Sequence, residues 1–200
     1  MVTPGSLKYT PGKMSKGESA AMASILVLYS VVGGYLAGTQ PSGAGWRLFS
    51  WHPFLMMVGM VGCLGSAAII KKIGGYTNTK IHGILSWIGV FCSIGGMYAI
   101  YLNKENNGAQ HFKSSHGKAG LALLLSCLGL GLVGGIVLHP DFGIDKTNKN
   151  IRAIHKFSAR FIILLSWINS FVGLYTLTHD NIALMMFTLP LLLMFPLTLM

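Results

Sequence analysis

The sequence predicts an all-α integral membrane protein, a six-helix transmembrane bundle. Its composition is 52% hydrophobic and only 10% charged, which lies outside the range of soluble globular chains. Its 26 glycines are typical of membrane helices, where small residues let backbones approach closely. Six stretches carry no Asp, Glu, Lys or Arg, and each provides the roughly 20 apolar residues of one helical crossing. These stretches, spans 1 to 6, are residues 19–46, 48–70, 81–103, 119–140, 161–179 and 181–200.

The chain begins with a polar segment and ends in an apolar one. Residues 1–18 lack the hydrophobic run and cleavage site of a signal peptide, so we expect a flexible cytosolic tail. Residues 19–200 are expected to form one transmembrane domain, with span 1 at its periphery because it has no histidine. Span 6 ends at Met200 without a flanking basic residue, which predicts that the chain is cut short there.

The basic residues predict the orientation of the bundle. Of the 15 Lys and Arg residues, 11 lie in the tail, the 71–80 loop and the 141–160 region, which share one face. The positive-inside rule places this face and both termini in the cytosol. The net charge of +10 is spread over short loops and forms no basic groove with aromatic residues, so no nucleic-acid partner is expected. The predicted surroundings are a lipid bilayer.

A histidine opens each of spans 2, 3, 4 and 5. Successive crossings alternate in direction, so His52 shares the non-cytosolic face with His116, and His82 shares the cytosolic face with His155. An ionisable residue at the edge of a span is costly and marks a functional site. Imidazoles on facing helices can hold a metal or a haem iron from both sides. We therefore predict two haems among spans 2 to 5, one near each surface, as a path for electrons.

Other polar residues near these positions have a functional and a structural interpretation. Lys80 is a candidate to bind an anionic substrate or a haem propionate, or it is a snorkelling lysine that sets topology. Arg160 is a candidate propionate partner, with lipid phosphate as the alternative. His111 and Lys113 lie in the longest non-cytosolic loop and are candidates for an acceptor site, or surface residues without a role.

The remaining histidines and the cysteines are interpreted as structural. His139 and His179 end spans 4 and 5 and are expected at the interface, although His139 remains a competing ligand on the cytosolic face. Cys63, Cys92 and Cys127 lie in the middle of spans and form no metal or disulfide motif, so we expect them to pack as small apolar residues.

Four segments resemble the cytochrome b561 family, most closely its branch of small domain-containing transmembrane reductases. They are Phe49-Ser50-Trp51-His52-Pro53, the histidine that opens span 3, the segment from Lys104-Glu105 to His116-Gly117-Lys118-Ala119-Gly120-Leu121, and the histidine of span 5. The resemblance implies two non-covalent haem b groups, one between helices 2 and 4 and one between helices 3 and 5. It also implies that electrons pass from cytosolic ascorbate to ascorbyl (monodehydroascorbate) radical or ferric chelates.

The same resemblance implies where the substrates dock. It places Lys80, with Arg152 or Lys149, near the ascorbate, and His111 near the acceptor. It suggests an endomembrane location, such as the endoplasmic reticulum or vesicles, and it is compatible with a homodimer.

Two functional hypotheses follow. The first is a di-haem transmembrane ascorbate ferrireductase or monodehydroascorbate reductase, whose substrates dock at basic rims because two histidines leave iron no open position. The alternative is a histidine-based metal-ion or proton transporter. Against the transporter, no carboxylate lies within a span, and the four histidines lie near the surfaces and not at one midplane site. A purely structural role leaves the regular alternation of the histidines unexplained.

Overall fold

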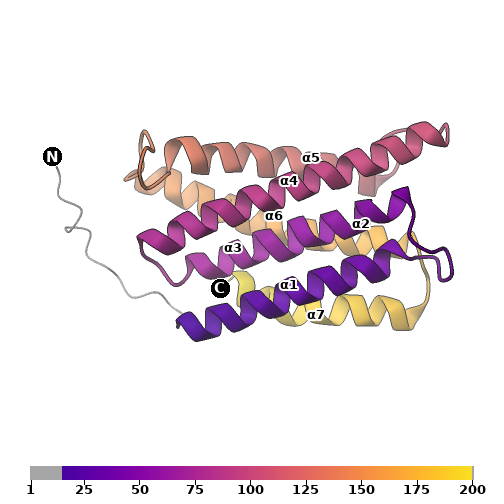
Figure 1. Ribbon diagram of the computed structural model, residues 1–200. Helices are drawn as coiled ribbons and strands as arrows, with labels where there is room; N and C mark the ends of the chain where they lie inside the picture. The colour runs from indigo at the N-terminus through magenta and orange to yellow at the C-terminus, as the bar shows by residue number, and fades with distance from the viewer. Residues whose placement is uncertain (1–14, 200) are drawn as a thin grey trace.

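The protein is a bundle of long helices that run side by side (Figure 1). The computed structural model describes residues 15–199, the last three by backbone only. Seven α-helices are described, together with one short 3₁₀ turn (η1) and two π-helical segments (η2 and η3). In chain order they are α1 Lys16–Gly38, η1 Leu48–Ser50, α2 Trp51–Met56, η2 Met57–Cys63, α3 Leu64–Lys71, α4 Tyr76–Asn106, α5 Ser115–Leu132, η3 Val133–Val137, α6 Lys149–Tyr175 and α7 Asn181–Leu199. The prediction of an all-α membrane bundle is confirmed.

Within the described part of the chain, five helical rods are long and apolar enough to cross a membrane. They are Lys16–Gly38, Leu48–Lys71, Tyr76–Asn106, Ser115–Val137 and Lys149–Tyr175, and Asn181–Pro196 is a shorter apolar helix. Large apolar side chains such as Leu28, Phe91 and Phe157 are exposed on the outside of the bundle, as expected for surfaces that face lipid. The protein is therefore an integral, multi-pass membrane protein.

The first helix starts earlier than the charge pattern predicts. Ser15 and Glu18 form a capping box: the Ser15 hydroxyl accepts from the Glu18 amide (3.2 Å), and the Glu18 carboxylate accepts from the Ser15 amide (2.9 Å). This reciprocal bonding satisfies two amides that a helix start leaves without partners, so α1 begins at Lys16. The expected tail lies outside the described residues up to residue 14.

The second rod is continuous but irregular. Pro53 lies in the first turn of α2, where a missing N–H costs nothing, and the π-helical η2 follows. Gly59 in η2 lies against α4, where an added Cβ would be 2.6 Å from the Gly89 carbonyl oxygen. Glycine is therefore required for the close contact of η2 with α4.

The rods that carry the four histidines form the centre of the bundle. The α2–η2–α3 rod packs on α4, α4 packs on α5, and α5 packs on α6. Helices α1 and α7 lie together on one side (Figure 1), where the Tyr29 hydroxyl donates to the Phe187 carbonyl (2.5 Å). Buried Met60, Val90 and Cys127 form a core cluster between the central rods. This packing brings the histidine-bearing ends of different rods together.

Candidate functional site

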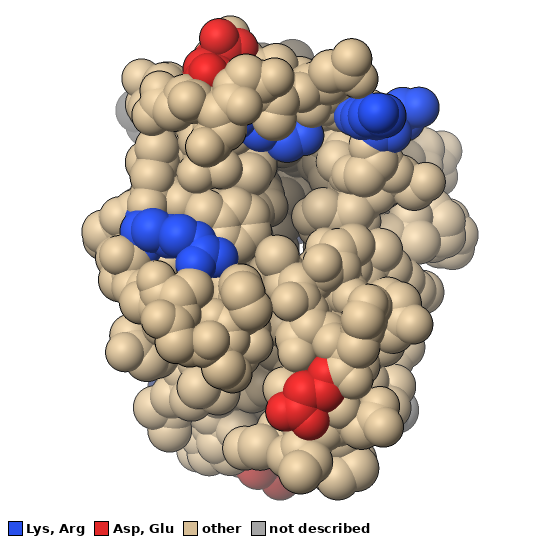
Figure 2. Space-filling model, turned by 90° about the vertical axis from the view of Figure 1, so that its right-hand side faces the viewer, with Lys and Arg blue, Asp and Glu red and all other residues tan. Residues whose placement is uncertain are grey.

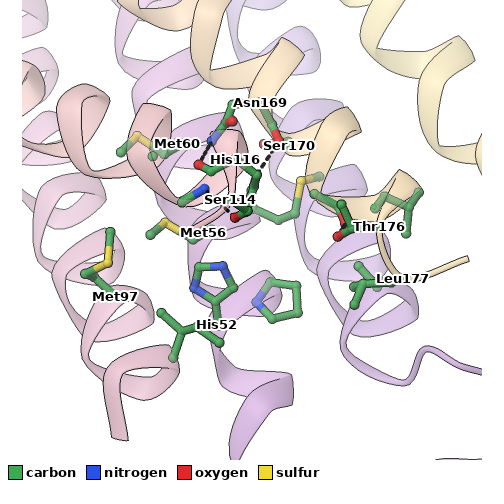
Figure 3. A pocket seen from close by; sticks show the side chains of 18 of the residues that line it. His52, Met56, Met60, Met97, Ser114, His116, Asn169, Ser170, Thr176 and Leu177 are labelled. Carbon is green, nitrogen blue, oxygen red and sulfur yellow. Dashed lines mark hydrogen bonds between the residues drawn. The ribbon is translucent and has the colours of Figure 1, made fainter. Parts of the chain in front are cut away.

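The first pair of histidines lies in one cavity. His52 is in the first turn of α2, and His116 is in the first turn of α5, which the Ser114 hydroxyl caps by accepting from the Gly117 amide (3.1 Å). Their ring centroids are 6.1 Å apart. Both rings line a largely apolar cavity that also contains Met97 (Figure 3). We call this the His52 end of the bundle.

The second pair lies at the opposite end of the rods. His82 is near the start of α4 and His155 is near the start of α6, and their ring centroids are 6.4 Å apart. Helices α4 and α6 begin at the left of Figure 1, whereas α2 and α5 begin at the right. We call this the His82 end. The structure thus brings together the same partners that the count of crossings predicts.

The spacing within each pair fits one iron between two imidazoles. A metal–nitrogen bond of about 2 Å, plus about 1.1 Å from this nitrogen to the ring centre, puts two opposite imidazole centroids about 6 Å apart. The observed separations are 6.1 Å and 6.4 Å. The separation of the ring centroids in either pair is thus compatible with one metal ion held between two imidazoles.

Hydrogen bonds orient three of the four imidazoles. A backbone carbonyl can only accept, so a ring Nδ1 that bonds to one must carry the proton, which leaves Nε2 as the free ligand atom. Such bonds to carbonyls are typical of metal-binding histidines. They join Nδ1 of His52 to the Gly96 oxygen (2.9 Å), Nδ1 of His82 to the Ala67 oxygen (3.0 Å), and Nδ1 of His116 to the Asn169 oxygen (3.0 Å).

His155 is held in another way. Its Nδ1 is buried and has no hydrogen-bond partner among the residues that the structure describes. Gly134 lies beside the ring, and a Cβ there would be 3.2 Å from Cε1 of His155. Gly173 similarly borders His116, where a Cβ would be 2.7 Å from Cε1. Glycine at both positions leaves room for an imidazole against the neighbouring helix.

The predicted cationic residues lie on α4 and α6, the two helices that carry His82 and His155. Lys80 forms an ion pair with Asp141 (Nζ–Oδ2 3.1 Å), a partner that the sequence did not indicate. Lys149 and Arg152 are exposed in the first turn of α6, and Arg160 is partly buried further along that helix. The Lys80 ammonium is thus already paired with a carboxylate.

His111, predicted near an acceptor, lines the same cavity as His52 and His116. Its Nε2 lies 2.6 Å from Glu105 Oε1, and its ring stacks on Tyr101 with centroids 4.5 Å apart. Lys113 is exposed in the adjoining loop. The carboxylate and the aromatic ring thus fix the position of His111 at the mouth of the cavity.

Sequence reasoning missed one cation at this mouth. Lys104 lines the cavity, and its ammonium donates to the Gln110 carbonyl (2.8 Å). Viewed onto this end, the molecule shows scattered charged side chains around a hollow (Figure 2). The sequence does contain a signal for this position, because Lys104 directly follows the charge-free span 81–103 at its non-cytosolic end, the end where His52 and His116 were expected.

The histidine pairs do not extend into larger ligand clusters. Among the described residues, no three His, Cys, Asp or Glu side chains gather where they would hold a metal ion. Protein zinc sites take three or four such ligands. Each pair of imidazoles is a donor set that could hold a haem iron.

Fold and site together define a class: a multi-pass helical membrane protein with one imidazole pair near each end of its central rods. The family model described as eukaryotic cytochrome b561 matches residues 51–180, which contain all four paired histidines. The chain belongs to the cytochrome b561 family.

Curated relatives are similar at low identity. The chain is 26% identical to the mouse (Mus musculus) transmembrane reductase CYB561D2 over 142 residues, 66% of this chain and 64% of that protein. It is 25% identical to the pig (Sus scrofa) transmembrane ascorbate-dependent reductase CYB561 over 182 residues, 87% and 71% of the two chains. It is 30% identical to the human (Homo sapiens) transmembrane reductase CYB561D2 over 105 residues, 48% and 47% of the two chains. The chain thus spans about half to two thirds of the length of the CYB561D2 relatives.

Proposed function

We propose that this chain is a transmembrane ascorbate-dependent reductase that binds two haem b groups. In this proposal electrons pass from cytosolic ascorbate at the His82 end to ascorbyl radical or a ferric chelate at the His52 end. The observation that carries it is the presence of two separate imidazole pairs, 6.1 Å and 6.4 Å apart, at opposite ends of the bundle. Relatives named ascorbate-dependent reductase and lysosomal membrane ascorbate-dependent ferrireductase, the latter CYB561A3 of Mus musculus (23% identical; 60% of this chain and 52% of that protein), support it.

The residues of the chain determine how such a cofactor would work. Bound haem supplies one-electron chemistry at its iron. Each histidine pair would hold one haem iron through its two imidazoles, so donors and acceptors would dock at the protein surface and not on the metal. The Nδ1–carbonyl bonds of His52, His82 and His116 hold the rings in orientation, and such bonds raise the basicity of the ligand nitrogen.

The basic residues suggest where each substrate docks. Lys80, Lys149 and Arg152 lie in the first turns of α4 and α6 and suit an organic acid anion, while Arg160 suits a haem propionate. His111 and Lys113, together with Lys104, suit an acceptor at the His52 end. The excess of Lys and Arg at the His82 end supports a cytosolic position for that end and for both termini. An endomembrane location and a homodimer complete the proposal.

A visible absorption spectrum tests the proposal directly. The protein is produced with haem available, purified, oxidised and then treated with ascorbate. Low-spin b-type bands that sharpen on reduction, with two haems per chain, are expected; a colourless protein overturns the proposal. Replacement of His116 by alanine should remove one haem and spare the one at the His82 end. Equal loss of both haems contradicts the pairing.

A further inference from the structure

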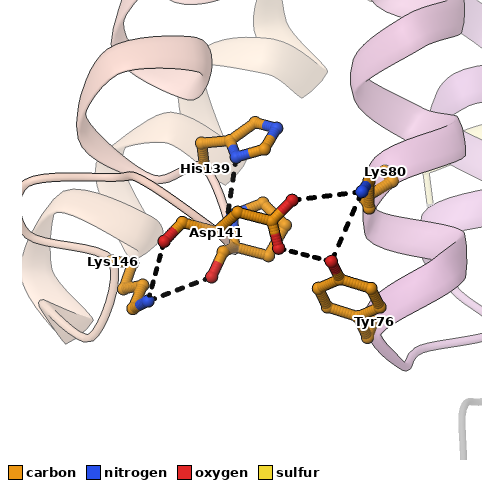
Figure 4. Close-up of polar contacts among 6 residues, drawn as sticks. Tyr76, Lys80, His139, Asp141 and Lys146 are labelled. Carbon is orange, nitrogen blue, oxygen red and sulfur yellow. Dashed lines mark hydrogen bonds and ion pairs between the residues drawn. The ribbon is translucent and has the colours of Figure 1, made fainter.

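The loop between η3 and α6, residues 138–148, contacts the start of α4 through one carboxylate. Asp141 Oδ2 lies 3.1 Å from Lys80 Nζ, and Oδ1 accepts from the Tyr76 hydroxyl (Figure 4). The Lys80 ammonium also donates to the Tyr76 oxygen (3.3 Å). Tyr76 and Lys80 lie one turn apart on α4, so Asp141 binds a two-residue anion site formed by a single helix face.

The loop is built so that Asp141 keeps its place without Lys80. The amides of Ile144 and Asp145 donate to carbonyls of η3 (3.2 Å and 3.1 Å). The Lys146 ammonium donates to the Asp141 carbonyl (3.3 Å), and the Asp141 amide donates to His139 Nδ1 (3.2 Å). These four contacts hold the backbone of the loop next to α4, while the Asp141 carboxylate itself contacts only Tyr76 and Lys80 among the described residues.

The ion pair itself is easily broken. The side chains of Lys80 and Asp141 are 42% and 39% exposed, and exposed pairs of this kind contribute little net stability. The hydrogen bond from Tyr76, followed by that from Lys80, lowers the pKa of Asp141, so its carboxylate is ionised at neutral pH. An anion from solution can thus take over the Lys80 ammonium at small cost.

We propose that Asp141 is an internal competitor of the anionic electron donor: its carboxylate occupies Lys80 and Tyr76 until the donor displaces it. The inference deepens the proposed function and rests on it, because that function assigns Lys80 to the donor. The donor class is a small organic acid anion whose oxygen atoms accept from the ammonium and from the phenol. The loop thereby reduces the affinity of the site for every such anion.

Replacement of Asp141 by asparagine is the first test, since an amide keeps the size of the side chain and removes its charge. In the full-length haem-loaded protein, the KM for ascorbate is expected to fall about two- to fivefold, the range that a surface ion pair provides, with kcat unchanged. Asp145→Asn is the matched control, because it removes the same charge from the same loop, where Asp145 accepts from the Asn148 amide group (2.8 Å). A KM for Asp141→Asn that is unchanged or raised overturns the proposal.

A second measurement is independent of electron transfer. Acetylation of Lys80 by an amine-reactive reagent is followed by peptide mass spectrometry, with ascorbate 2-phosphate as a non-reducing anionic probe. Asp141→Asn should accelerate labelling, and the probe should protect Lys80 at a concentration about two- to fivefold lower than in the wild type. Identical protection curves for the wild type and Asp141→Asn overturn the proposal that Asp141 competes with the donor. If the curves shift but ascorbate reduces neither protein, Asp141 does compete with anions for Lys80, and ascorbate is not the electron donor.

Discussion

Replacement of Gly173 by alanine is expected to weaken haem binding at the His52 end alone. The new Cβ would lie 2.7 Å from Cε1 of His116 and 3.2 Å from both ring nitrogens. Carbon atoms in favourable contact are about 3.5 to 4.0 Å apart, so the ring must retreat by about 0.8 Å. This retreat stretches the 3.0 Å bond from His116 Nδ1 to the Asn169 carbonyl beyond hydrogen-bonding distance.

Loss of such an orienting bond typically lowers metal affinity by about 10- to 100-fold. The assay is a haem titration of the purified protein in detergent, followed by absorbance and by a redox titration that resolves the two haems. Binding of the haem at the His52 end should weaken, and the haem at the His82 end should bind with wild-type affinity. Gly129→Ala is the control, because no atom lies within 4 Å of a Cβ at that position. Two fully bound haems with unchanged potentials in Gly173→Ala would refute the placement of His116.

Three further changes test other parts of the structure. Gly134→Ala creates a milder contact, 3.2 Å from Cε1 of His155, so a smaller loss of affinity is expected at the other haem in the same titration. Lys80→Ala should slow reduction by ascorbate in stopped-flow experiments, and an unchanged rate would remove Lys80 from the donor site. Tyr29→Phe removes the hydrogen bond to the Phe187 carbonyl and should lower the free energy of unfolding by about 1 kcal/mol. Its haem spectrum should stay unchanged, whereas wild-type stability in denaturant would show that this bond does not anchor α7.

The sequence predicted the bundle and the histidine pairs because the order of the membrane crossings along the chain determines the face at which each residue lies. Once charge-free spans are identified, antiparallel crossings determine which residues share an end, and His52 must then group with His116. Helix boundaries were less predictable. The charge-free span 5 starts only at residue 161, and it is the apolar periodicity that predicts helix well before Arg160, as α6 from Lys149 confirms. Absence of charge marks the hydrocarbon layer and not the helix. Arg152 and Lys156 are compatible with helix outside that layer.

The contacts of the loops were not predictable in the same way. Lys80 and Asp141 come from different rods, and their pairing depends on how the 138–148 loop folds back on η3. His111 and Glu105 meet because the chain turns at Gly108, which has a positive φ of 61°. Charge patterns show that such residues lie on one face of the membrane, but the loop backbone selects the partner.

The hydrogen bonds of the imidazoles reveal a regularity that no spacing in the sequence shows. His52 bonds to a carbonyl of α4, and His82 on α4 bonds back to the rod that carries His52. His116 on α5 bonds to α6, so the same exchange would give His155 on α6 a carbonyl of the α5 rod. That rod changes there to the π-helical η3, which alters the register of its carbonyls, and His155 packs against Gly134 without such a bond in the described structure. The two ends of the bundle are therefore related but not equivalent, because at one of them packing takes the place of a hydrogen bond.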